Sequence, residues 1–238
     1  MVSAYFKFKR VSEYFKYLSS RKLRTSIFVL TFDDVVNDSN IEIAEYLYDQ
    51  NISATFFVPA KLTEREILRG LVKMNHELGG HGYTHSNEER EEDYLIAKQC
   101  MSILKKYDKN VISWRFPWLS YTKKSVKNVL EAGFRIDSSK GCFYPIQNFY
   151  KIDGLVELPF LRLPPKWQMD INVEYNKIFD YVLRMSKLKG ITVLPFHTKY
   201  QYSHYKEFRR LIEELIEKEI EFKNLREAYF YLENVEDD

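Results

Sequence analysis

Ser26-Ile-Phe-Val-Leu-Thr-Phe32 is the longest strand-like apolar run in the chain, and it leads directly into Asp33 and Asp34. A strand that is apolar on both faces is typical of a parallel sheet covered by helices. Shorter strand-like runs recur near residues 54–58, 77–81, 111–115, 134–137, 155–159, 191–196 and 220–222. Helical spacing of apolar residues separates them, at about residues 40–50, 63–75, 88–106, 122–133, 173–190, 205–218 and from 224 onward. This alternation predicts an α/β fold on a parallel sheet, either a closed barrel or an open doubly wound sheet.

Local signals predict where two of the helices begin and end. Thr63 and Glu66 have the spacing of a capping box, which predicts a helix that begins there. Thr122 predicts a second helix start, and Gly133 predicts the end of that helix. His76 falls near the end of the first helix, where we expect a surface position favoured by the helix dipole.

Composition excludes several classes of protein. The chain has 238 residues, of which 45% are hydrophobic, and a formal net charge of +2. The apolar content excludes intrinsic disorder, and the only cysteines, Cys100 and Cys142, are too few for a disulfide scaffold and are expected to be reduced. No apolar run approaches the roughly 18 residues of a membrane span. The first 20 residues lack the apolar core and cleavage site of a signal peptide. We therefore expect a single-domain, cytoplasmic protein.

Basic and aromatic residues are concentrated at the N-terminus. Residues 1–24 contain one acidic residue, Glu13, and seven basic residues, which are Lys7, Lys9, Arg10, Lys16, Arg21, Lys22 and Arg24. The pattern predicts that residues 1–25 form a basic amphipathic extension packed on a barrel of residues 26–238. The alternative is contact of this segment with a membrane surface or an anionic polymer. We expect no nucleic-acid partner, and the oligomeric state stays open.

Reactive side chains follow several of the predicted strands at the point where each strand ends. Asp33 and Asp34 are the first, and the others are His81, His85, Arg115, Trp118, Asp137 and His197. The carboxyl ends of parallel strands meet at one mouth of a barrel, where enzymes of that architecture place their catalytic groups. The pattern therefore indicates an enzyme.

His81 and His85 have a spacing at which two imidazoles can share one cation. A carboxylate beside them would complete a three-ligand site with an open position, as in catalytic zinc centres. Asp33 and Asp34 are the candidates, and in an extended strand their side chains point to opposite sides. Taken singly, each feature is more often an ordinary structural histidine or an Asp pair at a helix cap. Their joint position at neighbouring strand ends favours the metal site.

Five motifs together carry a resemblance to a known family. They are Thr31-Phe-Asp-Asp34, His81-Gly-Tyr-Thr-His85, Arg115-Phe-Pro-Trp118, Asp137-Ser-Ser139 and Leu194-Pro-Phe-His197. In order and approximate spacing, residues 26–200 resemble the polysaccharide deacetylase family, also known as the NodB homology or carbohydrate esterase family 4 proteins. The resemblance implies a single-domain, distorted (β/α) barrel of seven to eight strands. It also implies a hydrolase that removes N-acetyl groups from an amino sugar or N-acetylated glycan, so that a carbohydrate is the partner.

The same resemblance implies a metal centre and a base. Asp34, His81 and His85 would hold a divalent metal ion, usually zinc. Asp33 would act as general base toward a metal-bound water that attacks the amide carbonyl. Arg115 would pair with Asp33 and keep it ionised and oriented.

The remaining motifs are implied to handle the leaving group and the oxyanion. His197 would be the general acid that protonates the amine. The backbone N–H of Trp118 would help to stabilise the oxyanion. Asp137 begins the fourth motif, whose role is less uniform in the family. The second ring nitrogen of His197 needs a partner, for which Asp137 and Glu157 are both candidates.

The chain departs from the family pattern at positions that do not remove a ligand. Val35 stands where glycine often follows the Asp pair, Gly82 where Ser or Thr is usual, and Pro195 where Leu often lines an acetyl pocket. Trp118 replaces a more frequent Tyr. These differences leave two alternatives open. One is a hydrolase of C–N bonds in a non-sugar substrate, similar to allantoinase, and the other is a catalytically silent carbohydrate-binding barrel.

Overall fold

The computed structural model describes residues 2–20, 23–36, 39–86, 94–162, 175–197 and 204–236. The strands are β1 (Ser26–Asp33), β2 (Thr55–Val58), β3 (Glu77–Gly80), β4 (Ser113–Trp114), β5 (Ile136–Asp137), β6 (Gly141–Cys142), β7 (Tyr150–Ile152), β8 (Leu155–Glu157), β9 (Phe160–Leu161), β10 (Gly190–His197) and β11 (Glu221–Lys223). The helices are α1 (Val2–Ser19), α2 (Ser39–Asp49), α3 (Arg65–Lys73), α4 (Tyr94–Leu104), α5 (Lys123–Ala132), α7 (Tyr175–Ser186), α9 (Tyr205–Glu217) and α10 (Leu225–Glu236), with a short 3₁₀ turn, η2 (Pro117–Leu119).

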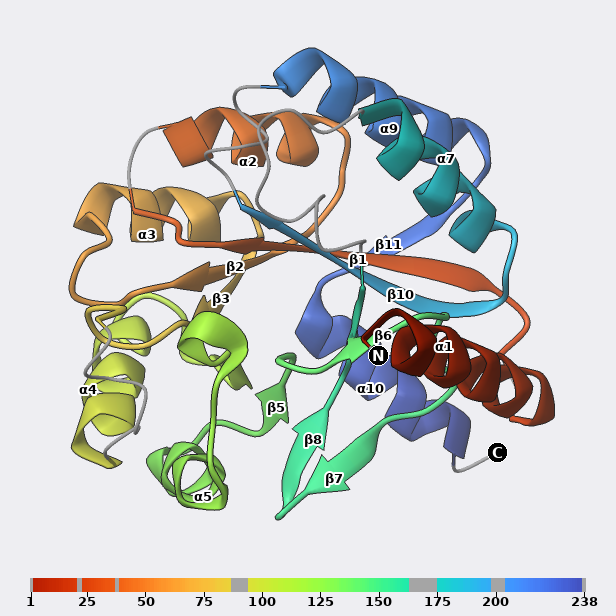
Figure 1. The fold of residues 1–238 in the computed structure, drawn as a ribbon. Helices are drawn as coiled ribbons and strands as arrows, with labels where there is room; N and C mark the ends of the chain where they lie inside the picture. Colours follow the sequence, from red (N-terminus) through yellow and green to blue (C-terminus); the bar gives the residue numbers. More distant parts are fainter. Residues whose placement is uncertain are drawn as a thin grey trace.

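All the strands belong to one curled sheet. Its order is β6-β9-β10-β1-β2-β3-β4-β5-β8-β7, and β11 pairs with β1. Among the described strands, every neighbouring pair from β6 to β8 is parallel, as is the β1–β11 pair, and only the β7–β8 pair is antiparallel. Among the described residues no pairing joins β6 to β7, so the sheet is curled without closing. Figure 1 shows α2, α3, α4, α5, α7 and α9 in an arc around its outer side. The predicted α/β single domain is confirmed, as a curled half-barrel in which β7 is the one antiparallel strand of those described.

The alternation of side chains along β1 explains why its carboxyl end becomes polar. Phe28, Leu30 and Phe32 belong to the core cluster that packs against the outer helices. Ile27 and Val29 belong to a second cluster on the inner face. Because side chains alternate along a strand, the next inner positions are Thr31 and Asp33. The inner face is therefore apolar at the start of the strand and polar at the end.

The second cluster is completed by α10, which packs across the inner face. Leu225, Ala228 and Leu232 of this helix join it. The start of α10 rests on polar groups at the amino ends of the strands: Leu225 N–H donates to Thr55 Oγ1, and Arg226 N–H donates to Glu77 Oε2. One end of the half-barrel is thus filled, and the other is left to the strand termini.

Both predicted helices form, but the predicted cap is right at α5 and wrong at α3. Thr122 and Ser125 form a capping box at the start of α5, and Gly133 ends that helix in the left-handed conformation, with φ 112°. At α3 the cap residue is Glu64, which makes no side-chain cap. Thr63 instead donates its hydroxyl to the carbonyl of Val35, 2.7 Å away. That bond ties the start of α3 to the segment that follows the Asp pair.

His76 is not on the surface, contrary to expectation. It is 3% exposed, beneath α2 and beside β2. Nδ1 accepts a hydrogen bond from Ala54 N–H, and Nε2 lies 2.9 Å from the carbonyl of Ala44. Burial lowers the pKa of His76 to about 4, so the ring is neutral. The helix ends before it, and the residue begins the approach to β3.

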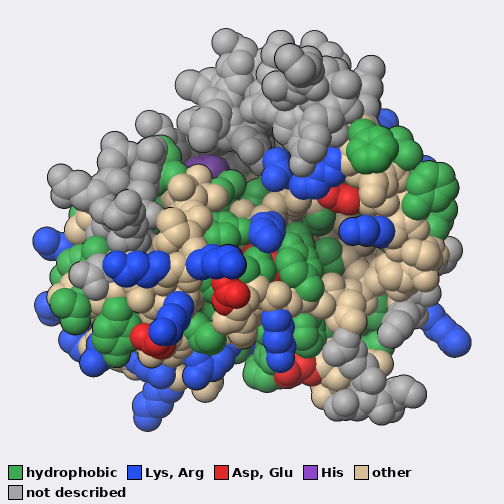
Figure 2. Space-filling model, turned by 60° about the horizontal axis from the view of Figure 1, so that its bottom comes forward, with side chains coloured by type: hydrophobic (Ala, Val, Ile, Leu, Met, Phe, Trp, Pro, Cys, Tyr) green, Lys and Arg blue, Asp and Glu red, His purple; other side chains and the backbone are tan. Residues whose placement is uncertain are grey.

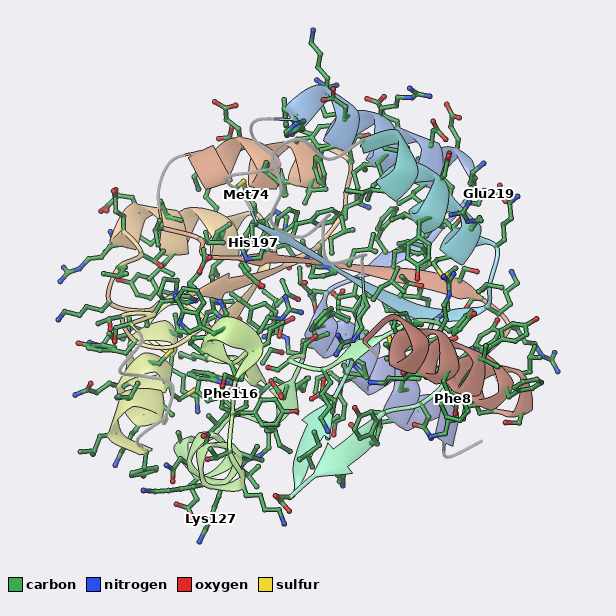
Figure 3. The ribbon with its side chains drawn as sticks, in the orientation of Figure 1. Phe8, Met74, Phe116, Lys127, His197 and Glu219 are labelled. Atoms are coloured by element: carbon green, nitrogen blue, oxygen red, sulfur yellow. The ribbon has the colours of Figure 1, made fainter. Side chains whose placement is uncertain are left out.

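The N-terminal segment forms α1, which touches the domain through one face. Tyr17 is buried and stacks on Tyr144, and Glu13 accepts a hydrogen bond from Phe143 N–H. On the other face Phe8 and Phe15 are 75% and 64% exposed. Figure 3 shows Phe8 far from His197. The division of the chain at residue 25 stays a prediction. In the part of the chain that the structure describes, no helix is long and apolar enough to cross a membrane.

Candidate active site

The first predicted residues, Asp33 and Asp34, lie where β1 ends. Parallel pairing of β1 with β10 places Asp33 directly beside His197. Asp34 leaves the strand with a φ of 56°, in the left-handed region that Asp tolerates better than most residues. This turn brings the second carboxylate to the same mouth as the first: Asp34 Oδ2 lies 3.8 Å from His197 Nε2. The two carboxylates are thus available from different directions.

His81 reaches the mouth because β3 ends in two glycines, Gly79 and Gly80. A Cβ on Gly79 would lie 2.5 Å from the ring of Phe57, and one on Gly80 would lie 2.5 Å from the ring of Trp114. Glycine at both positions lets β3 pass between these rings. Gly82, the departure noted from the sequence, has a φ of 78°, which suits glycine better than Ser or Thr.

Asp34, His81 and His85 converge on one point. Each offers a ligand atom, and these atoms all lie within 4.8 Å of one another. Asp34 Oδ1 is 3.7 Å from His81 Nε2 and 3.3 Å from His85 Nε2. Ligand distances of about 2.0–2.1 Å in tetrahedral geometry place ligand atoms roughly 3.3 Å apart. The donor set therefore fits a divalent cation of zinc type.

Surrounding groups orient the first histidine. His81 Nδ1 lies 2.8 Å from the carbonyl of Arg115, which leaves Nε2 directed at Asp34. A hydrogen bond at one ring nitrogen is how proteins fix the tautomer of a metal-binding histidine. Burial lowers the pKa of His81, which favours the neutral ring that a metal requires. The outer side of the site is open, since the Asp34 side chain is 45% exposed. Figure 2 likewise shows histidine surface reaching the outside.

Arg115 holds Asp33 in a buried network. Its Nη1 donates to Asp33 Oδ1 at 2.7 Å and to Thr31 Oγ1 at 2.9 Å. Nε donates to the Ser138 carbonyl, and Nη2 donates to the Ser138 hydroxyl. Burial acts to raise the pKa of Asp33, but Arg115, followed by His81 and His197, outweighs burial and holds that pKa below its ordinary value. Asp33 is therefore an ionised carboxylate with one oxygen anchored, which is the state that a general base needs.

Trp118 lies at the rim, in the turn η2 that follows Arg115. Its φ is 57°, and the backbone strain that this implies for a bulky residue is typical of functional sites. The indole ring is 5.0 Å from the ring of His85 and is 49% exposed. The structure brings Trp118 to the predicted metal site, and the role of its N–H stays a prediction.

Asp137 is buried at the end of β5, beside Glu157 at the end of β8. These residues are partners in the β5–β8 register. Asp137 Oδ2 and Glu157 Oε2 are buried and have no hydrogen-bond partner among the described residues. Burial raises the pKa of Asp137, and burial together with the Asp137 carboxylate raises the pKa of Glu157. A single proton shared by the two carboxyl groups would remove the repulsion between two buried negative charges.

The motifs alone did not predict that Ser138 and Ser139 support the site. Ser138 receives the Arg115 guanidinium, while the Ser139 hydroxyl donates to Asp137 Oδ1 and accepts from Phe116 N–H. Ser139 therefore links the fourth motif to the turn that carries Trp118. The only signal was their place in the Asp137-Ser-Ser139 motif. The partner of His197 stays open between Asp137 and Glu157.

Comparisons with known proteins agree with this arrangement. The model of the polysaccharide deacetylase family matches residues 20–136, a span that contains the Asp pair, both histidines and Arg115. The resemblance to the polysaccharide deacetylase family is thereby confirmed. A curated relative, chitin deacetylase 1 of Bombyx mori, is 32% identical in an alignment of 69 residues that covers 26% of this chain and 13% of that protein. The chain thus spans a small part of that relative's length.

Solved structures share the family fold at low sequence identity. A protein from Mycobacterium smegmatis assigned as a polysaccharide deacetylase has a TM-score of 0.69 and 18% identity, covering 90% of this chain and 92% of its own. A family 4 acetyl xylan esterase from Clostridium thermocellum, solved with a cobalt ion, has a TM-score of 0.60 and 17% identity, covering 86% of this chain and 91% of its own. A family 4 pseudoenzyme from Bacillus anthracis has a TM-score of 0.57 and 17% identity, covering 87% of this chain and 66% of its own. The fold therefore accommodates both active and inactive members.

Proposed function

We propose that the protein is a metal-dependent hydrolase that removes N-acetyl groups from an amino sugar of a glycan. The observation that carries the proposal is the convergence of Asp34, His81 and His85, flanked by the anchored carboxylate of Asp33 and by His197. The match to the polysaccharide deacetylase family supports a deacetylase acting on sugar polymers. A silent barrel would not need to keep three ligands and both proton-transfer groups together.

The first step of the proposed reaction, activation of water, depends on the candidate cation site. Asp34, His81 and His85 would hold the ion, and a ligand set of two imidazoles and one carboxylate is found in catalytic zinc sites. A bound cation of this kind supplies Lewis-acid chemistry and lowers the pKa of water from about 15.7 toward 7. The exposed side of Asp34 is the direction from which a substrate amide approaches.

Asp33 and His197 divide the proton transfers. Arg115 keeps Asp33 ionised, so its free oxygen takes the proton from the attacking water. His197 stands on the paired strand, and its side chain is 32% exposed, so it can reach a leaving amine in the mouth. The backbone N–H of Trp118 donates to the oxyanion, for which preorganised donors contribute several kcal/mol, roughly 3–4 for one donor.

The function is tested by acetate release from chitohexaose by the full chain supplied with Zn²⁺ or Co²⁺. We expect turnover that a chelator abolishes and that either ion restores. Ammonia release from a ureide, with no acetate release, would replace the proposal with the non-sugar C–N hydrolase. Tight binding of chitohexaose without turnover under every cation would replace it with the silent barrel.

The roles of the Asp pair are separated by two matched variants. Asp33→Asn should reduce the rate while the chain still binds one cation, and Asp34→Asn should lose the cation itself. Circular dichroism checks that both variants fold, because Asp33→Asn leaves Arg115 without its carboxylate partner. An unchanged rate in Asp33→Asn would contradict its assignment as the base.

A further inference from the structure

A basic groove lies beside the candidate active site, between α3 and the end of α4. It encloses about 790 Å³. Its lining includes five basic residues, which are Lys61, Arg65, Arg69, Lys73 and Lys106. Four of these recur at every fourth position along the chain, so that Arg65, Arg69 and Lys73 share one face of α3. The α4 side contributes Lys106 and Tyr107.

The positive charge in this groove is weakly compensated. None of the described residues that line it is acidic. Glu66 lies 3.3 Å from Arg69, but both side chains of that pair are more than 60% exposed, so the pair contributes little. A concave surface lined with one sign of charge concentrates the field and attracts ions of the opposite sign.

The remaining walls of the groove suit a sugar chain. Leu68, Val72 and Ile103 supply apolar surface between the basic groups. The guanidinium of Arg69 lies 6.0 Å from the centre of the Tyr107 ring. An aromatic ring beside cationic groups can pack against a sugar while its neighbours bind the anionic substituents.

One end of the groove adjoins the metal-site loop. Ala60 N–H donates to the carbonyl of Gly82, and Lys61 N–H donates to the carbonyl of Tyr83, 2.9 Å away. Lys61 Nζ also lies 5.6 Å from the centre of the Tyr83 ring. Tyr83 stands between His81 and His85. A chain bound in the groove therefore leads toward the ligands of the candidate cation.

We propose that this groove binds the anionic groups, phosphate or carboxylate, of a glycan whose N-acetyl sugar lies at the candidate active site. The proposal rests on the proposed function, because it names the substrate class of the same site. A glycan is favoured over a membrane, because the surface is concave, and over a nucleic acid, because one end of the groove adjoins the loop that carries His81 and His85. The groove would act on substrate binding and leave the chemical step unchanged.

The test compares three oligosaccharides in acetate release: chitohexaose, its 6-O-phosphorylated form and its carboxymethylated form. The variant is Arg65→Glu with Lys73→Glu, and the control is Lys123→Glu with Lys124→Glu, which makes the same charge change at exposed positions on α5. We expect the groove variant to raise KM for the anionic forms about tenfold and to leave kcat, and KM for chitohexaose, unchanged. The phosphorylated and carboxymethylated arms show which anionic group is preferred.

Binding without turnover separates this proposal from the proposed function. Calorimetry with the phosphorylated oligosaccharide in a chelator should show affinity that salt weakens and that the groove variant loses. If this binding is observed while no substrate releases acetate, the groove proposal is supported and the proposed deacetylase function is refuted. Equal KM values for all three oligosaccharides in the unmodified chain would contradict the proposal that the groove binds anionic groups, and would leave the proposed function unaffected. Tighter binding of a single-stranded oligonucleotide or of anionic vesicles would overturn the choice of a glycan.

Discussion

At the amino ends of the strands, Glu77 is fully buried and accepts hydrogen bonds from Thr55 Oγ1, Ser113 Oγ and Arg226 N–H. At the carboxyl ends, Asp34 is 45% exposed, and its oxygens face three histidine nitrogens at 3.3–3.8 Å, longer than hydrogen bonds. Both ends gather polar side chains from neighbouring strands. The first end satisfies its carboxylate internally, and the second leaves its carboxylate directed at a point where a ligand can bind.

The comparison of the two ends separates carboxylates that stabilise the fold from carboxylates that are available to a ligand. At the closed end, α10 covers the polar residues and donates its first N–H groups to them. At the open end, Arg115 satisfies one oxygen of Asp33 and leaves the mouth accessible. Barrels commonly divide stability and catalysis between their two ends in this way. The following substitutions test that division.

The largest effect is expected at the open end, from His85→Ala. Loss of one of three ligands should lower acetate release by roughly a thousandfold, since cation chemistry contributes several kcal/mol and each 1.36 kcal/mol is tenfold. The free energy of unfolding in a chelator should change little, because the ring is at the rim. Metal titration and urea unfolding measure the two quantities, with His204→Ala as control. Full cation occupancy in His85→Ala would contradict the ligand set.

Glu77→Ala should produce the opposite pattern. Three buried donors lose their acceptor, which costs about 4 kcal/mol of the free energy of unfolding at roughly 1–3 kcal/mol for each donor. The rate of the folded fraction should be unchanged. Urea unfolding in a chelator measures the loss, and Glu77→Gln, which keeps an acceptor oxygen, should lose less. A lower rate of acetate release in Glu77→Ala, with an unchanged free energy of unfolding, would show that the closed end takes part in catalysis.

His76, also at the closed end, should make stability depend on pH. Its pKa is about 4 in the folded chain and 6.5 ordinarily. Between these values the unfolded chain binds more protons, so stability is complete above about pH 6.5 and falls as the pH drops toward 4. The expected loss is about 3 kcal/mol, from 1.36 kcal/mol for each unit of pKa. Unfolding of His76→Gln across this range should show a flatter pH dependence, whereas His204→Gln should keep the original slope.

Most of the residues at the open end could be predicted from the sequence, because short stretches of sequence are enough to locate them. Each reactive residue either ends a strand or lies shortly after one, and strand ends can be located from apolar runs such as Ser26–Phe32. The parallel alternation of strands and helices then places these ends together. The sequence could not show that Asp34 adopts a φ of 56°, which brings both carboxylates to one mouth.

The closed end could not be predicted, because its contacts are distant in the sequence. His76 is buried by Ala44 and Ala54, and Glu77 is covered by Arg226, which is 149 positions away. The capping box at Thr63 failed for the same reason, since its hydroxyl bonds Val35. The strands β6 and β9 have two residues each, too short to produce a pattern.

The smallest effect is expected from Trp118→Phe at the open rim. If the contribution of this residue is its backbone N–H, then a change of ring leaves that donor in place, and the rate should stay within about twofold of the original. Stability should change by less than about 0.5 kcal/mol, because the side chain is 49% exposed. Trp118→Gly, which relieves the φ of 57°, should also keep the donor and most of the rate. A tenfold loss in kcat for both variants would assign the role to the indole ring beside His85 and remove the backbone donor from the mechanism.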